Sequence, residues 1–131
     1  MVLYQGIDII NIPKFKQFCE RHAAAAGDIF TACEIASSKE YRKSVDRLAG
    51  RFAAKEACLK ALGLGFTGTF AFGVLNQIEI NNKPSGKPEI TLHGFVKSVS
   101  QRKKINSFNV SISHSGDYAV SMVTLISAPE A

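Results

Sequence analysis

The chain has 131 residues, of which 46% are hydrophobic, and its formal net charge is +5 at pH 7. This length predicts one domain, residues 1–131, with enough apolar side chains for a core. No apolar run approaches the ~20 residues that cross a bilayer, and the N-terminus lacks the pattern of a signal peptide, so we expect no membrane partner. The modest positive charge favours an anionic partner: nucleic acid, a phosphate-bearing metabolite or an acidic protein.

Cysteine usage and charge arrangement narrow these classes. Cys19, Cys33 and Cys58 have neither metal-site spacing nor the even number of a disulfide framework. We therefore expect reduced thiols and a cytoplasmic protein. The basic residues do not form a stripe with interleaved aromatic side chains, which argues against a nucleic-acid-binding domain.

The chain begins with a predicted strand and helix. Residues 2–10 are apolar except for Gln5 and Asp8, as in a largely buried strand. Asn11 is suited to cap the helix that follows, and Pro13 is suited to its first turn.

Further helices are predicted up to residue 62. Thr31, followed three residues later by Glu34, is a capping box that begins a short helix. Residues 37–40 open another helix, which we expect to run through residues 41–62, with Gly50 inside it or near a break. A glycine-rich loop is expected to follow.

The C-terminal half reads mainly as strands. Residues 77–81 and 89–92 predict two strands joined by a turn rich in proline and glycine. A short amphipathic helix is expected around residues 95–99. Residues 107–114 alternate between polar and apolar side chains, and this strand is expected to pair with a last strand at residues 118–125. The predicted fold class is α+β, a mainly antiparallel sheet packed against a long central helix and shorter helices.

The central helix carries charges in an apolar setting. Residues 51–63 are apolar or small on nearly every helical face, which is typical of a buried helix. Lys55, Glu56 and Lys60 nevertheless lie within it, and Arg51 precedes Lys55 by one turn. Desolvated charges cost on the order of several kcal/mol each unless they are paired or bound to a ligand. We therefore interpret these charges as functional.

Asp8 and Glu56 are candidate metal ligands. A lone aspartate in a strand is commonly edge-facing or capped, and Glu56 with Lys60 also fits a helix ion pair, worth ~0.3–0.5 kcal/mol if exposed. Two carboxylates in apolar surroundings instead predict a hard oxygen site. Mg²⁺ suits this site because one or two protein carboxylates suffice, with water and substrate phosphates as the other ligands.

Two other segments predict anion binding. His114 ends a predicted strand, and with Ser113 it makes a polar strand end that would hold an anion; a core or turn histidine is the alternative. The turn at Gly86, Lys87 and Pro88 would touch a nucleotide, although such turns are common.

Together these segments resemble a known family, the holo-[acyl-carrier-protein] synthases, which are small single-domain 4′-phosphopantetheinyl transferases. The similar segments are GIDI at residues 6–9, FAAKEACLKALG at 52–63, SGKP at 85–88 and SISH at 111–114. Their order and separation agree with the family, and so does the length of the chain.

The resemblance implies an α+β phosphopantetheinyl transferase fold and a reaction. Such enzymes move the 4′-phosphopantetheine arm of coenzyme A to a serine of apo-acyl carrier protein, which leaves adenosine 3′,5′-bisphosphate. The carboxylates matching Asp8 and Glu56 bind Mg²⁺, and the lysine matching Lys60 contacts the phosphates. The histidine matching His114 binds coenzyme A from a neighbouring subunit, so a homotrimer with inter-subunit active sites is expected.

The expected site follows from both lines of argument. Asp8, Glu56 and Lys60 are the expected catalytic residues. Glu56, directly or through a metal-bound water, is the expected base, and Lys60 is the alternative if burial lowers its pKa. The expected coenzyme A contacts are Arg51, Lys55, Lys60, Gly86, Lys87, Pro88, Ser113 and His114.

The first helix is a candidate docking surface for an acidic carrier protein, because Lys14, Lys16 and Arg21 lie beside Phe15 and Phe18. An ordinary amphipathic helix explains the same pattern. A non-catalytic module that binds coenzyme A or another nucleotide is the alternative function. Which carrier protein is served stays open.

Overall fold

The computed structural model describes residues 1–39, 44–65 and 73–129. The elements are, in chain order, β1 (Leu3–Asn11), α1 (Ile12–Arg21), α2 (Ala25–Ile29), α3 (Ala32–Ser38), α4 (Ser44–Ala61), the 3₁₀ helix η1 (Leu75–Gln77), β2 (Ile78–Asn82), β3 (Pro88–Leu92), α5 (Gly94–Arg102), β4 (Ile105–Ser115) and β5 (Tyr118–Ser127). This confirms the α+β class.

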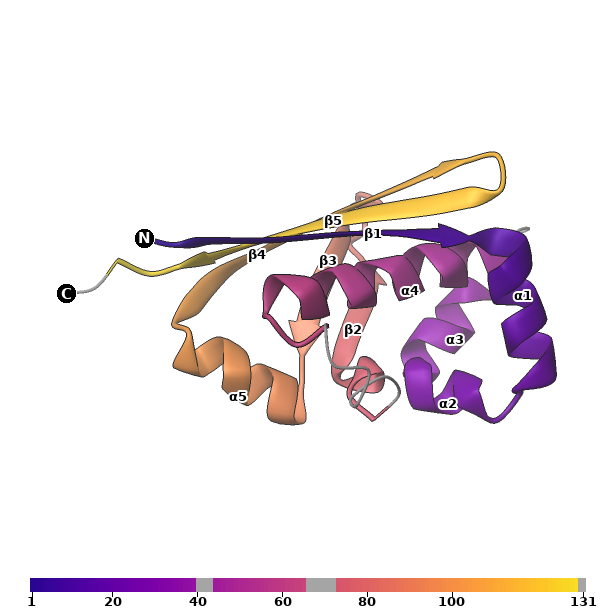
Figure 1. The fold of residues 1–131 in the computed structure, drawn as a ribbon, viewed down its shortest axis with the longest axis horizontal. Helices are drawn as coiled ribbons and strands as arrows, with labels where there is room; N and C mark the ends of the chain where they lie inside the picture. Colours follow the sequence, from indigo (N-terminus) through magenta and orange to yellow (C-terminus); the bar gives the residue numbers. More distant parts are fainter. Residues whose placement is uncertain (40–43, 66–72, 130–131) are drawn as a thin grey trace.

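The described strands form two antiparallel sheets rather than the single sheet expected. The larger has the order β1-β5-β4, and β2 pairs only with β3. The β2–β3 hairpin runs across the direction of the three long strands (Figure 1). Its first residue, Ile78, is held instead by α4, because the Ile78 carbonyl accepts a hydrogen bond from Lys55. Periodicity alone could not show whether the hairpin joins the three-stranded sheet or forms a sheet of its own.

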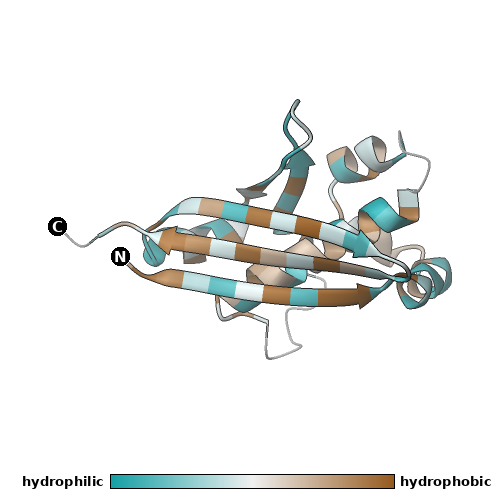
Figure 2. Cartoon of the chain, turned by 90° about the horizontal axis from the view of Figure 1, so that it is seen from above, coloured by the Kyte–Doolittle hydropathy of each residue, from teal (hydrophilic) through white to brown (hydrophobic). Residues whose placement is uncertain are grey.

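The three-stranded sheet is covered on one face only. Helix α4 runs along that face, α1, α2 and α3 gather at one end of it, and α5 lies toward the end where both chain termini emerge (Figure 1). Among the described elements, no helix crosses the opposite face when the sheet is seen from above (Figure 2). In β1, the residues that face α4 therefore alternate with residues that face outward.

Small residues bring α4 very close to the sheet. A Cβ atom on Gly6 would overlap the carbonyl oxygen of Ala57 and would lie 2.8 Å from the backbone nitrogen of Ala61. Gly50 lies similarly against β4, where an added Cβ would be 2.8 Å from Ile112 Cγ2. This close approach holds Asp8, two residues after Gly6, beside the C-terminal half of α4.

The helix starts confirm the predicted capping, whereas one boundary is corrected. Asn11 accepts a hydrogen bond from the backbone of Lys14 at 3.0 Å, and the Thr31–Glu34 capping box is complete. Ser37 and Ser38, however, end α3 instead of opening a new helix.

The central helix continues through Gly50 without a break. The absence of a side chain at Gly50 allows α4 to pack closely on β4. Residues 40–43, and the part of the glycine-rich loop at residues 66–72, lie outside the described ranges. Within the described ranges, no helix combines the length and apolar character needed to cross a bilayer.

Candidate active site

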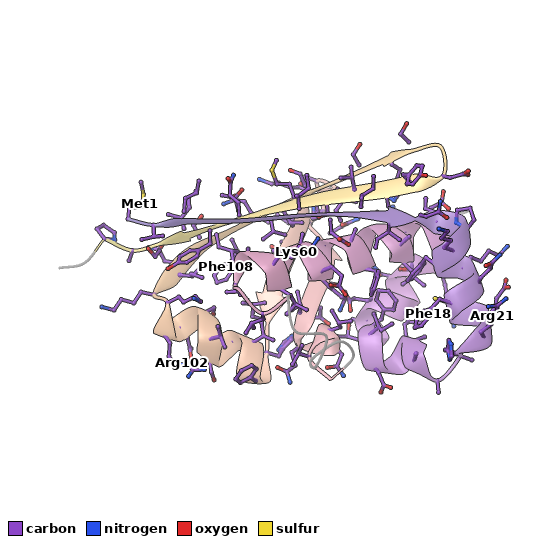
Figure 3. All side chains as sticks on the ribbon, viewed as in Figure 1. Met1, Phe18, Arg21, Lys60, Arg102 and Phe108 are labelled. Atoms are coloured by element: carbon purple, nitrogen blue, oxygen red, sulfur yellow. The ribbon has the colours of Figure 1, made fainter. Side chains whose placement is uncertain are left out.

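Strand β1 and helix α4 bring Asp8 and Lys60 together. Lys60 Nζ donates hydrogen bonds to Asp8 Oδ1 and to the carbonyl oxygen of Ile7, each at 3.0 Å. The Lys60 side chain is 38% exposed and that of Asp8 is 16% exposed, so the pair opens onto solvent on the lysine side. Lys60 lies where α4 passes beneath the three-stranded sheet (Figure 3).

The second oxygen of Asp8 has no such partner. Asp8 Oδ2 is buried and accepts no hydrogen bond from any residue that the structure describes. A buried carboxylate oxygen left in this state costs about 1–3 kcal/mol or more, so such atoms are normally matched by a donor or a cation. Oδ2 is therefore the atom of Asp8 that suits a metal ion.

Glu56 lies within the electrostatic field of this pair. Burial raises the pKa of the Glu56 carboxyl above its ordinary value, and the negative charge of Asp8 raises it further. The charge of Lys60 acts in the opposite direction and lowers the pKa of Glu56. The structure thus brings Asp8, Glu56 and Lys60, which the sequence analysis selected, into one interacting group.

The donor set fits a hard divalent cation. Among the described residues there is no group of three or more His, Cys, Asp or Glu side chains arranged to hold a metal. Mg²⁺ does not need one, because it commonly binds through one or two carboxylates and completes its shell with water and phosphate oxygens. Asp8 and Glu56 supply that number.

Lys55 does not reach this site. Its side chain is fully buried, and Nζ donates to Glu34 Oε1 at 2.7 Å, to the Leu75 carbonyl at 2.8 Å and to the Ile78 carbonyl. Burial lowers the pKa of Lys55, and Glu34 partly offsets that effect. Since all three N–H groups are used inside the protein, we withdraw Lys55 from the expected coenzyme A contacts.

Arg51 is mostly structural but borders a polar pocket. The side chain is nearly buried, and Nη1 donates to the Glu34 carbonyl at 2.8 Å and to the hydroxyls of Ser37 and Ser38. A pocket of about 480 Å³ lies between α3, α4 and the β2–β3 hairpin. Its lining residues are Ser37, Arg51, Asn81, Asn82, Lys83, Pro84 and Gly86. Arg51 and Gly86 therefore share a pocket, whereas Lys87 and Pro88 are not among its lining residues.

His114 lies at the other end of α4. Its Nε2 atom is 2.8 Å from the carbonyl oxygen of Asp46, and the ring packs against Gly50. Gly50 and Lys60 are ten residues apart on one helix, which is about 15 Å along its axis. His114 and the exposed Ser113 are consequently not joined to the Asp8–Lys60 pair within one chain.

Two features of the site region were missed from the sequence. Glu34 was read only as a helix cap, and its buried pairing with Lys55 has no local sequence signal. An apolar pocket of about 320 Å³ beside α1 was also missed, although the sequence analysis had noted Phe15 and Phe18, which line it. It is lined by Ile9, Ile10, Asn11, Lys14, Phe15, Phe18 and Phe52.

A family model described as the 4′-phosphopantetheinyl transferase superfamily matches residues 5–123. The chain is 36% identical over 126 residues to a holo-[acyl-carrier-protein] synthase of Koribacter versatilis, covering 95% of this chain and 98% of the relative. It is 38% identical over 120 residues to the protein of the same name from Clostridium kluyveri, covering 92% and 87%.

Solved structures agree with these sequence matches. A complex described as Chronobacterium ammoniagenes ACPS with CoA superposes with a TM-score of 0.83 at 27% identity, covering 98% of this chain and all of that chain. The holo-[acyl-carrier-protein] synthase of Helicobacter pylori in complex with coenzyme A gives a TM-score of 0.75 at 32% identity, covering 93% and 99%. The fold and the sequence thus point to the same relatives.

Proposed function

Because the chain belongs to the holo-[acyl-carrier-protein] synthases of the 4′-phosphopantetheinyl transferase superfamily, we propose a mechanism in which Asp8, Glu56 and Lys60 act on the diphosphate of coenzyme A. The enzyme transfers the 4′-phosphopantetheine arm of coenzyme A to a serine of apo-acyl carrier protein. The other product is adenosine 3′,5′-bisphosphate. The single observation that carries the mechanism is the buried, unpartnered Oδ2 of Asp8 beside Lys60.

Asp8, through Oδ2, and Glu56 hold Mg²⁺ in this proposal. When bound, the ion neutralises the charge that develops on the diphosphate as the bisphosphate departs. Burial and then the charge of Asp8 raise the pKa of Glu56, and this supports the assignment because a cation shared with Asp8 would offset both effects.

Lys60 supplies a fixed positive charge to the phosphates. Its ammonium is oriented by Asp8 Oδ1 and by the Ile7 carbonyl, and its partial exposure leaves the third N–H direction available to a ligand. A cation held in place before the reaction costs no reorganisation during it, which is the basis of electrostatic catalysis.

Glu56 is the proposed acceptor of the serine proton. The serine oxygen forms a bond to the β-phosphorus while the bond from that phosphorus to the bridging oxygen of adenosine 3′,5′-bisphosphate breaks. The proton of the serine hydroxyl passes to the carboxylate oxygen of Glu56 that does not hold the ion. Because Lys60 is paired with Asp8, Lys60 suits the role of a fixed cation better than that of the base.

Arg51 lies nine residues before Lys60, about 13.5 Å along α4, so the nucleotide portion of coenzyme A is proposed to enter the pocket lined by Arg51, Lys83 and Gly86 of a neighbouring copy. Arg51 and Lys83 give this pocket a positive character, which complements phosphate groups. Lys87 and Pro88 follow in the same hairpin and remain proposed contacts at its rim.

We infer a homotrimer from the uncovered face of the sheet and from the position of His114. Leu3, Ile7, Ile9 and Met122 point outward on that face and are between 47% and 62% exposed. Apolar side chains gathered in this way mark an interaction surface. Since His114 and Ser113 lie far from Lys60 in one chain, they would complete the coenzyme A site of a neighbouring copy.

The acyl carrier protein is proposed to dock on α1. Lys14, Lys16 and Arg21 project from this helix, and the apolar pocket beside it is bordered by Phe18 and Phe52. The helix lies at the same end of the sheet as the C-terminus of β1 (Figure 3). Basic side chains around an apolar pocket suit an acidic helix that inserts one apolar side chain.

The mass of apo-acyl carrier protein tests the proposed activity. Incubation with the enzyme, coenzyme A and Mg²⁺ should add one phosphopantetheine group to the carrier, and chelation of the metal should prevent the addition. Binding of coenzyme A without any mass gain on several carrier proteins would favour the non-catalytic module instead.

The three free thiols support a cytoplasmic location, which we also propose.

A further inference from the structure

We propose that the buried ion pair between Glu34 and Lys55 is a positioning device that fixes how α4 sits on the sheet. By fixing α4, it would place Glu56 and Lys60 relative to Asp8. The inference rests on the proposed function, since that proposal gives Asp8, Glu56 and Lys60 their roles.

The ammonium of Lys55 is anchored at three points in three different elements. It donates to Glu34 Oε1 in α3, to the Leu75 carbonyl in η1 and to the Ile78 carbonyl at the start of β2. Lys55 is fully buried, so these bonds are shielded from water. Helix α4 is thereby tied to α3, η1 and β2 through acceptors that lie 20 to 23 residues from Lys55 in sequence.

Glu34 is anchored as completely as its partner. Oε1 also accepts the backbone N–H of Thr31 at 2.8 Å, and Oε2 accepts the backbone N–H of Ile80 at 2.9 Å. All three N–H groups of Lys55 and both carboxylate oxygens of Glu34 therefore have hydrogen-bond partners. A fully satisfied buried network is directional, and its best-attested role is to specify one register.

The opposite side of α4 approaches the sheet through small residues. At 100° per residue, Lys55 lies about 200° around the helix from Ala57, whose carbonyl rests on Gly6. Small side chains let two surfaces approach closely but do not interlock as larger ones do. Lys55 supplies, on the far side of α4, a fully buried directional contact that adds to the partly exposed bonds of Lys60 on the side of the sheet.

A small displacement of α4 would affect the proposed site directly. On the same helix, Glu56 is the next residue after Lys55, and Lys60 is five residues after Lys55. Asp8 is on β1, so any slide or rotation of α4 changes its distance from both. A misplacement of about 1 Å can cost about 10²-fold in rate when reacting groups must be aligned.

The double variant Glu34→Gln/Lys55→Met separates positioning from stability. It removes both buried charges at nearly constant volume, a change that is often neutral for stability. We expect a folded protein in which kcat at saturating coenzyme A and Mg²⁺ falls at least tenfold. We also expect a Kd for Mn²⁺, measured by electron paramagnetic resonance, at least tenfold weaker than in the wild type.

The matched control is Asp28→Asn/Lys97→Met, which removes one exposed charge of each sign at positions outside the proposed site. It should leave the Mn²⁺ affinity unchanged. A folded Glu34→Gln/Lys55→Met protein with wild-type kcat and wild-type Mn²⁺ affinity would overturn the proposal.

Lys55→Arg provides a second variant, because it keeps the charge but cannot direct three donors from one atom. A folded Lys55→Arg protein should bind Mn²⁺ several-fold more weakly, and unchanged binding would count against positioning. Failure of both variants to fold would assign the pair to stability alone and would also overturn the proposal.

A metal-independent readout keeps this test distinct from the proposed function. If wild-type protein and Asp8→Asn bind Mn²⁺ equally, the proposed metal site is wrong. The distance between Lys60 Nζ and Asp8 Oδ1, 3.0 Å in the wild type, is then measured in a crystal structure of the double variant. A broken pair supports positioning of α4, and an intact pair refutes it.

Discussion

Asp8 has two carboxylate oxygens with different surroundings. Oδ1 is bound by Lys60, whereas Oδ2 is buried without a hydrogen bond from any described residue. In the proposed mechanism, this asymmetry lets one side chain orient the Lys60 ammonium through Oδ1 and hold a metal ion through Oδ2.

Asp8→Asn should lower the rate of phosphopantetheine transfer at least ~10³-fold, since it removes a proposed metal ligand and the partner of Lys60 together. The Asp8–Lys60 pair is partly exposed, so its loss should reduce the free energy of unfolding by only about 0–1 kcal/mol. Initial rates and urea unfolding measure the two effects. Asp28→Asn, at an exposed position of α2, is the control and should behave like the wild type. If the Asp8 variant were as active as the wild type, Asp8 would not be part of the active site.

The raised pKa of Glu56 predicts a pH dependence of metal binding. A proton competes with the metal for Glu56, so Mn²⁺ affinity should fall as the pH is lowered, with a midpoint above the ordinary glutamate value of 4.5. Without metal the sign reverses for stability: a carboxyl whose pKa is raised in the folded state stabilises the protein at low pH, and this contribution is lost as the pH rises through the raised pKa.

Carbon-13 NMR of the Glu56 carboxyl measures this pKa directly. In Asp8→Asn the pKa of Glu56 should decrease, because the charge of Asp8 contributes to the upward shift. An unchanged pKa of Glu56 in that variant would place the two groups too far apart to share an ion.

At the scale of elements, the contact between β1 and α4 controls the site. Gly6→Ala would drive a methyl group into the Ala57 carbonyl and force the strand and helix apart. We expect a loss of at least about 1–3 kcal/mol in the free energy of unfolding and a larger loss of activity than of stability. Gly27→Ala is the control, because no atom lies within 4 Å of its added Cβ. Equal unfolding free energies for the two variants would contradict this account of the contact.

Local signals in the sequence predicted the elements better than their partners. Asn11 and the Thr31–Glu34 capping box act within four residues of themselves, so both could be identified from spacing. The destination of Lys55 could not, because its three acceptors lie 20 or more residues away and are brought together only by the fold.

The proposed metal ligands stand out in the sequence for a different reason. Asp8 interrupts an apolar strand and Glu56 lies on a nearly all-apolar helix, so each charge is conspicuous in its own segment. Lys55 looked equally conspicuous, yet it is satisfied internally by Glu34. Sequence context identifies a buried charge but not whether protein or ligand neutralises it.

For the whole molecule, the proposed site requires more than one chain, because His114 lies far from Lys60 within each chain. The outward face of the sheet carries Ile7 and Ile9, which are 60% and 62% exposed. If copies of the chain associate through this face, activity and assembly should be lost together.

Ile7→Glu/Ile9→Glu should convert a trimer to monomers, because it places charges in an apolar contact. Light scattering measures the mass, and transfer activity should fall at least ~10²-fold with it, since aligned groups from two chains are separated. Phe95→Glu, an exposed aromatic on α5, is the control and should remain trimeric. A fully active monomer would refute the shared site.

The most direct test is a crystal structure with coenzyme A and Mn²⁺, in which anomalous scattering locates the ion. We predict one ion bonded to Asp8 Oδ2 and to a Glu56 oxygen, in contact with the diphosphate and close to Lys60. An ion bound elsewhere, with Asp8 Oδ2 still buried and without a partner, would contradict the account.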